Sequence, residues 1–135
     1  MITILSVAGI LIIPAVQPAL EATRVEAGAR KTAAFLDDAR RISVLARKPV
    51  TVRCRPDENQ LEPEAQGVDF KKHGIRGPFS IPEPLTLAKC QPEEVRYFPQ
   101  GGAESLELTL RDPRGRERVI RVGTFTGLAR VEDRR

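Results

Sequence analysis

Few side chains in this sequence have a type and spacing that could do chemistry. The single histidine, His73, lies in a stretch rich in Gly and Pro, where an exposed bystander is its more common role. Asp37 and Asp38 are neighbours on a predicted helix, so their carboxylates point in different directions and do not form a catalytic pair. No serine or threonine is spaced from His or Lys as a nucleophile would be, and no phosphate-binding glycine loop follows a strand. The sequence therefore predicts a protein that is not an enzyme and uses no cofactor.

The two cysteines, Cys54 and Cys90, are too few to form a disulfide framework. Outside the cytoplasm they could pair with each other. Two small apolar side chains that are buried separately are an equally good interpretation. A metal site needs more ligands than these two thiols and His73 supply, so no metal is expected.

The densest basic cluster contains Arg114, Arg116 and Arg118, on a predicted hairpin. Arginines at a hairpin tip can bind phosphates through paired hydrogen bonds. The favoured interpretation is instead a charged turn that keeps the hairpin soluble, because Asp112 and Glu117 offset part of the charge. Nucleic acid is therefore kept only as the alternative partner.

Composition sets the limits for everything else. With 135 residues and a net charge of +4, the chain has room for one small domain beside its N-terminal stretch. Interleaved basic and acidic residues are typical of a solvated surface. The mild basic excess is still compatible with binding to acidic partners or to anionic lipid. With no Trp and one Tyr, the core must be built mainly from Val, Leu, Ile and Ala.

The other elements are organised around residues 1–20, which carry no charged side chain. About 20 mostly apolar residues can span a membrane as a helix. A cleaved signal would need basic residues before the apolar core, and a helix that is apolar all round would need a larger protein to bury it. We therefore favour an uncleaved stem that sits in a membrane and then packs against copies of itself, with kinks at Pro14 and Pro18. The stem residues are Ile2, Ile4, Leu5, Val7, Gly9, Ile10, Leu11, Ile12, Ile13 and Pro14.

Residues 21–48 are predicted to form an amphipathic helix that ends at Pro49, because the residue before a proline avoids the helical conformation. If Pro14 and Pro18 do not break it, this helix and the stem form one rod, part of which projects beyond the domain. The apolar face recurs at three- and four-residue steps and contains Ala22, Val25, Ala29, Ala33, Leu36 and Ala39, widened by Phe35, Ile42 and Leu45.

After Pro49 the period changes from helical to two, so residues 49–135 are predicted to form an antiparallel β domain. Strands are expected at 50–55, 67–70, 85–90, 95–99, 106–111, 118–122 and 128–131, with a loop at 56–66 and a surface excursion at 71–84. A turn at residues 112–115 joins two of the strands. The fold class is α+β, with one long helix laid on an antiparallel sheet.

Four segments, in this order and spacing, resemble type IV pilin-like minor pseudopilins. The family group is that of the type II secretion pseudopilin H and the type IV pilus minor pilin T. The segments are Leu36-Asp37-Asp38-Ala39-Arg40, Ala46-Arg47-Lys48-Pro49-Val50-Thr51, Tyr97-Phe98-Pro99-Gln100-Gly101-Gly102 and Thr126-Gly127-Leu128-Ala129-Arg130-Val131. With the apolar stem, the resemblance runs over nearly the whole length of the chain.

Two features depart from that family. Its start, a basic leader, a Gly cleavage site and then Phe-Thr-Leu-x-Glu, is missing before Met1, as expected of a late start codon, a trimmed chain or an unprocessed copy. DNA-binding members of the minor pilin T branch carry Gly-Arg-x-Arg near the C-terminus. Here Gly127-Leu128-Ala129-Arg130 lacks the first arginine, and Gly115-Arg116-Glu117-Arg118 fits the pattern on the preceding hairpin.

The resemblance implies a pilin-like subunit of a type II secretion or type IV pilus filament that acts in filament assembly and protein secretion. It implies a single-pass protein of the bacterial inner membrane with its C-terminal domain in the periplasm. The implied partners are other pilin-like subunits, met through the N-terminal helix, and the secretion machinery. The alternatives are a DNA-binding minor pilin that uses Arg114, Arg116 and Arg118, and an anchored periplasmic module unrelated to filaments.

Overall fold

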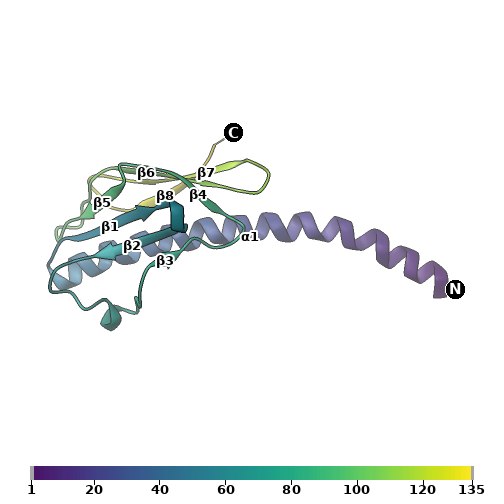
Figure 1. Ribbon diagram of the computed structural model, residues 1–135, viewed down its shortest axis with the longest axis horizontal. Coiled ribbons are helices and arrows are strands. Elements are labelled where there is room, and N and C mark those ends of the chain that lie inside the picture. The colour runs from purple at the N-terminus through teal and green to yellow at the C-terminus, as the bar shows by residue number, and fades with distance from the viewer. Residues whose placement is uncertain (1, 135) are drawn as a thin grey trace.

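One long helix organises the molecule, α1 (Ile2–Ala46), and all the strands follow it in the chain. The computed structural model describes residues 2–134, with side chains described at 20 and 22–132. Figure 1 shows the C-terminal half of α1 lying along the strands while its N-terminal half projects away from them. The expected single rod is present, since α1 continues through positions 14 and 18.

The half of α1 beside the strands buries the face that its periodicity predicts. Val25, Ala29, Leu36, Ala39 and Ile42 are each no more than 1% exposed. The ends of the predicted face differ: Ala22 is exposed toward the projecting half of the helix, and Leu45 is exposed at its C-terminal end.

The helix stops at Ala46 because the backbone reverses at the next residue. Arg47 has φ of 57°, in the left-handed region that commonly ends helices. Lys48 N then donates to Ser43 O at 3.2 Å, and Ser43 Oγ donates to Lys48 O at 2.8 Å. Pro49 follows, as the sequence predicts.

The strands form two antiparallel sheets rather than the single sheet expected. The first has the order β3-β2-β1-β5, from β1 (Val50–Arg55), β2 (Gln60–Glu64), β3 (Phe79–Ser80) and β5 (Glu94–Tyr97). The second has the order β4-β6-β7-β8, from β4 (Thr86–Gln91), β6 (Leu106–Arg111), β7 (Glu117–Val122) and β8 (Ala129–Arg134). Two short 3-10 turns, η1 (Pro56–Glu58) and η2 (Phe70–His73), lie in the connections.

Two predicted segments were wrong. Residues 60–64, expected in a loop, form β2, in which Leu61 is the buried apolar residue. Pro63 lies opposite Val52 of β1, and on the other side of β2 the short strand β3 pairs only with Gln60 and Leu61, so β3 needs no donor from Pro63. Residues 67–70, expected as a strand, lead instead into η2, where Asp69 Oδ1 accepts a hydrogen bond from Lys71 N at 3.1 Å.

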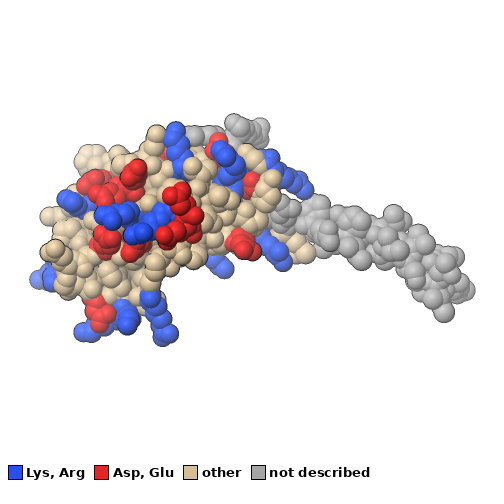
Figure 2. Space-filling model, in the orientation of Figure 1, with Lys and Arg blue, Asp and Glu red and all other residues tan. Residues whose placement is uncertain are grey.

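Both sheets contribute to one core beneath α1. Val52 and Val95 come from the first sheet, and Leu108, Leu110 and Ile120 from the second; each is fully buried. Several outward residues of the first sheet form ion pairs: Arg53 of β1 lies 3.5 Å from Glu64 of β2 and 3.6 Å from Glu94 of β5. Figure 2 shows this interleaving of positive and negative side chains over the strands.

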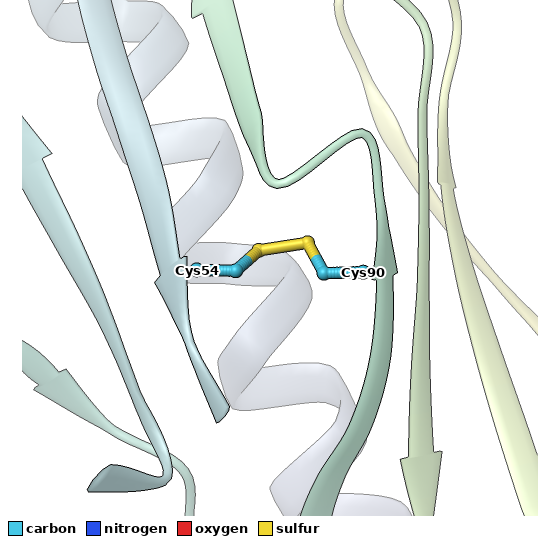
Figure 3. Close-up of a disulfide and its surroundings, with 2 residues drawn as sticks. All are labelled: Cys54 and Cys90. Atoms are coloured by element: carbon cyan, nitrogen blue, oxygen red, sulfur yellow. A yellow bond between two sulfur atoms is a disulfide. The ribbon is translucent and has the colours of Figure 1, made fainter. Parts of the chain in front are cut away.

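A disulfide between Cys54 and Cys90 connects the two sheets. Cys54 is in β1 and Cys90 in β4, and their Cα atoms are 6.5 Å apart (Figure 3). This separation lies within the usual range for disulfides. Because no hydrogen-bonded ladder joins β1 to β4, the covalent bond is a direct link between the sheets.

Candidate functional site

Arg40 of α1 fixes two loops that are far away in the sequence. Its Nε donates to the carbonyl oxygen of Gly101 at 2.9 Å and to that of Thr126 at 2.7 Å. These carbonyls belong to the loop after β5 and to the loop between β7 and β8. A guanidinium that donates to both carbonyls holds the two loops against the helix.

Asp37 extends this contact by one helical turn. Its Oδ1 accepts a hydrogen bond from Ala129 N at 2.9 Å, at the first residue of β8. Residues three apart lie on the same side of a helix, so Asp37 and Arg40 act on neighbouring parts of the chain. We call Asp37, Arg40, loop 98–102 and loop 123–128 the helix–loop joint.

The joint depends on two glycines in the left-handed region. Gly101 has φ of +99° and Gly127 has φ of +66°. A Cβ at position 127 would lie 3.0 Å from Arg40 Cδ and would also collide with the Gly101 carbonyl oxygen. The backbones can approach this closely only because the residue is glycine.

Tyr97, at the end of β5, fills the interior beside the joint. It is fully buried, and its hydroxyl has no hydrogen-bond partner among the described residues. Burial raises the pKa of the Tyr97 phenol well above its usual range; the Asp37 carboxylate raises it further and Arg40 acts in the opposite direction. A neutral phenol inside the core contributes by packing. The contacts of the helix–loop joint hold the two loops against the helix.

The predicted arginine cluster lies on the β6–β7 hairpin, but its members have different partners. Asp112 Oδ1 accepts from the backbone N of Arg114 and of Arg116, both at 2.9 Å, and its Oδ2 accepts from Arg116 Nε at 3.1 Å. Burial alone would raise the pKa of Asp112, yet these hydrogen bonds and the Arg116 charge lower it overall. Arg116 therefore serves the turn. Arg114 is exposed at the tip and Arg118 is half-buried in β7, so the three arginines differ in their surroundings, and an anion contact by all three stays a prediction.

The remaining predicted residues lie apart from the joint. Cys54 and Cys90 are bonded to each other, and His73 is half-buried in η2. No group of three or more His, Cys, Asp or Glu side chains that could hold a metal occurs among the described residues. The side chains of the stem, from Ile2 to Pro14, lie outside the described part. Where side chains are described, no helix is both long and apolar enough to cross a membrane, so the membrane stem stays a prediction.

Comparison with known proteins identifies the fold. No family model matches the sequence, and no curated protein matches it. The structure of the minor pseudopilin EpsH from the type 2 secretion system of Vibrio cholerae superposes with a TM-score of 0.62 at 13% identity, covering 82% of this chain and 97% of EpsH. The chain has a pilin-like fold.

The type IV minor pilin FimU of Pseudomonas aeruginosa shares this pilin-like fold in two crystal forms. The first has a TM-score of 0.56 at 19% identity, with 79% of this chain and 91% of FimU covered. The second has a TM-score of 0.53 at 18% identity, with coverage of 85% and 91%. Because the similarity extends over most of each chain, it includes both the helix and the strands.

Sequence reasoning missed the joint, although three of the quoted segments meet there. Residues 36–40 supply Asp37 and Arg40, residues 97–102 supply the first loop, and residues 126–131 supply the second. The sequence showed the two glycines and the charged helix residues, but not that they meet. A helix arginine, together with two glycine-containing loops whose carbonyl oxygens need a hydrogen-bond donor, is the combination that could have indicated the contact.

Proposed function

We propose that this protein is a non-enzymatic, minor-pseudopilin-like subunit of a type II secretion or type IV pilus filament. In this proposal the stem holds the subunit in the bacterial inner membrane, with the β domain in the periplasm. The subunit then leaves the membrane and packs its stem among other stems. Its role is in filament assembly and, in the secretion branch, in protein export.

One observation carries the proposal: a single helix is both the core helix of a two-sheet head and a projecting rod. A helix that only tethered an independent domain would not need to run unbroken into the core. The same architecture in a minor pseudopilin and in a type IV minor pilin supports a filament role. The disulfide supports an oxidising compartment such as the periplasm.

The experiment compares three forms of the full-length gene, expressed with its natural upstream DNA. The first is unchanged, the second has the order of residues 2–13 scrambled at constant composition, and the third carries an unrelated membrane anchor in place of residues 1–20. All three should fractionate with the membrane. Sheared filaments should contain the unchanged protein and lack most of the other two, because van der Waals packing of stems depends on the order of side chains and not on hydropathy alone.

Equal recovery of the anchor-swapped protein in filaments, or intact function of that protein, would favour the anchored module. Recovery of the unchanged protein in the soluble fraction would overturn the proposal. Mass spectrometry of the mature N-terminus in the same samples shows whether the protein is processed as pilin-like proteins are.

A further inference from the structure

The β6–β7 hairpin extends along α1 toward the projecting half of that helix (Figure 1). Pro113, at the hairpin tip, lines one open groove together with Leu20 and Arg24 of α1. Val25, the next residue of the helix, is 1% exposed, so the part of α1 that the sheets cover begins there. We call the hairpin tip at 113–116 and the helix turn at 20–24 the stem-side end of the head.

The stem-side end combines exposed arginines with exposed apolar residues. Arg24, Arg114 and Arg116 are exposed, as is Pro113, and Leu20 is 52% exposed. Figure 2 shows Lys or Arg side chains that extend from this end of the head. Within the part of the chain whose side chains are described, no ion pair engages Arg24 or Arg114. Their guanidinium groups are therefore available to a partner outside the chain.

Two acidic side chains lie at the same end, and they leave a basic excess. Asp112 is buried and its Oδ2 lies 3.1 Å from Arg116 Nε, so these two charges offset each other. Glu83, which is exposed in the same groove, is the carboxylate that opposes Arg24 and Arg114. A surface of this charge attracts an anionic partner.

Hydrogen bonds fix the hairpin tip before any partner binds. Asp112 Oδ1 accepts from the backbone N of Arg114 and of Arg116, both at 2.9 Å. Gly115 N donates to Asp112 O at 3.0 Å, which closes the turn. Arg114 is thus displayed on a backbone that loses little conformational freedom on binding, and this favours association.

The position of the stem-side end along α1 matches the headgroup layer of a bilayer that contains the stem. Leu20 is the last residue of the uncharged stretch, and Arg24 follows four residues later. At 1.5 Å per residue, Arg24 lies about 6 Å beyond Leu20. The polar layer on each side of the hydrocarbon core is about 5–8 Å thick. Because the hairpin tip shares a groove with both residues, it lies at the same depth.

We propose that the stem-side end binds the phosphate groups of anionic phospholipids through Arg24 and Arg114 while the stem is in the membrane. A guanidinium group pairs with phosphate oxygens through two parallel hydrogen bonds. Leu20 and Pro113 lie beside the arginines, as apolar residues do at a membrane interface. A nucleic acid duplex at this depth would be repelled by the anionic lipid itself.

This contact would fix the orientation of the head on the membrane before assembly. It must break when the subunit leaves the bilayer, so it opposes extraction of the stem. The inference rests on the proposed function, because it requires the stem to be in the bilayer.

The test uses the full chain in vesicles of phosphatidylcholine with or without phosphatidylglycerol, each with a trace of lipid that carries a nitroxide quencher on its headgroup. A bimane dye is attached to Pro113→Cys or, as the matched position, to Phe125→Cys, without reductant so that Cys54 and Cys90 stay paired. Phe125 is 96% exposed in loop 123–128, which Arg40 holds. Arg40 lies about 24 Å further along α1 than Arg24.

The quencher should act on the dye at 113 and not at 125, mainly in vesicles that contain phosphatidylglycerol. Arg24→Gln and Arg114→Gln should each lower the ratio of quenched to unquenched dye roughly fivefold, and the double variant roughly 25-fold. The control Arg41→Gln/Arg130→Gln removes two exposed arginines near the helix–loop joint and should leave the ratio unchanged. High salt should weaken quenching in the unchanged protein.

An alkaline carbonate wash and recovery in sheared filaments separate this inference from the proposed function. If the protein resists the wash and enters filaments, but quenching at 113 ignores lipid charge or the two arginines, the lipid contact is overturned and the filament role stands. If the wash releases the protein, both are overturned. If the double variant loses binding to a DNA duplex while quenching is unchanged, the arginines serve nucleic acid and the lipid contact is overturned.

Discussion

Arg40 and Gly127 fit together only because the glycine has no side chain. A Cβ at position 127 would lie 3.0 Å from Arg40 Cδ and 3.2 Å from Arg40 Nε. The arginine in turn donates to the carbonyl oxygen of the preceding residue, Thr126. The close contact between the helix and the loop at 123–128 therefore requires both the Arg40 side chain and the absence of a side chain at Gly127.

Gly127→Ala should destabilise the fold by about 2–4 kcal/mol, because it adds overpacking to left-handed strain. Gly115→Ala is the matched control. Gly115 also has positive φ, +82°, but an added Cβ there meets nothing within 4 Å, so the cost should be about 1 kcal/mol. Chemical denaturation measures both, and equal losses would contradict the role assigned to close packing at 127.

Arg40→Ala should cost about 1–3 kcal/mol, since two hydrogen bonds from a charged donor are lost and two loop carbonyls lose their partner. Arg41→Ala removes an arginine whose ion pair with Asp38 is largely exposed, so it should change stability by less than about 1 kcal/mol. Arg40→Lys keeps the charge but not the guanidinium geometry and should fall between the two. Hydrogen exchange in loop 123–128 should rise in Arg40→Ala and stay the same in Arg41→Ala, and an unchanged rate in Arg40→Ala would exclude the joint as the support of that loop.

Cys54→Ser should lower the free energy of unfolding by about 3–4 kcal/mol, the value expected when a bond that closes a loop of 36 residues is removed. The double variant Cys54→Ser/Cys90→Ser should be no less stable than the single variant by more than about 0.5 kcal/mol, because both remove the same bond. Adding reductant should shift the denaturation curve of the unchanged protein onto that of the variant. A reductant-insensitive curve would show that the cysteines are not paired in the purified chain.

Acid should loosen the β6–β7 hairpin through Asp112. Its folded pKa is lowered from 3.8, so the carboxylate stabilises the fold above that pH, and the stabilisation disappears as pH falls through the lower folded pKa. Asp112→Asn should remove this part of the acid dependence, whereas Asp57→Asn, on an exposed residue of η1, should leave it in place. NMR titration of the Asp112 side chain, with unfolding curves at pH 7 and pH 3, tests this expectation; an ordinary titration midpoint would refute it.

Tyr97→Phe should leave stability unchanged or raise it by up to about 1 kcal/mol, because a buried hydroxyl without a hydrogen-bond partner contributes desolvation and nothing else. Tyr97→Ala should cost about 3–5 kcal/mol through the cavity it leaves. A loss above about 1 kcal/mol in Tyr97→Phe would mean that an ordered water serves the hydroxyl, which a high-resolution crystal structure would reveal.

The helix could be predicted from the sequence because its signal is local. Val25, Ala29, Leu36 and Ile42 follow the helical period, and each is buried as that period requires. The strand at 50–55 was equally visible, since buried Val50 and Val52 alternate with outward residues. Both patterns arise because buried positions recur at a regular spacing along one helix or one strand.

The division into two sheets and the joint could not be predicted in this way. β2 has one buried apolar side chain, Leu61, and a proline, so alternation alone gives no strand there. The bonds from Arg40 connect residues 61 and 86 positions apart. The periodicity of a single element carries no information about hydrogen bonds between a helix side chain and distant loops. The glycines in those loops indicate only that the chain turns there.

The continuity of α1 also determines how the head responds to force. The residues that hold the helix against the sheets, from Val25 to Ile42, lie in line with its projecting half. A pull along that half therefore loads the whole helix–sheet contact in shear, so its side chains must slip together instead of peeling apart one by one. The Asp37 and Arg40 hydrogen bonds join the helix to two loops near its C-terminal end and add to the contact that a pull must break, while the Cys54–Cys90 bond keeps the two sheets linked.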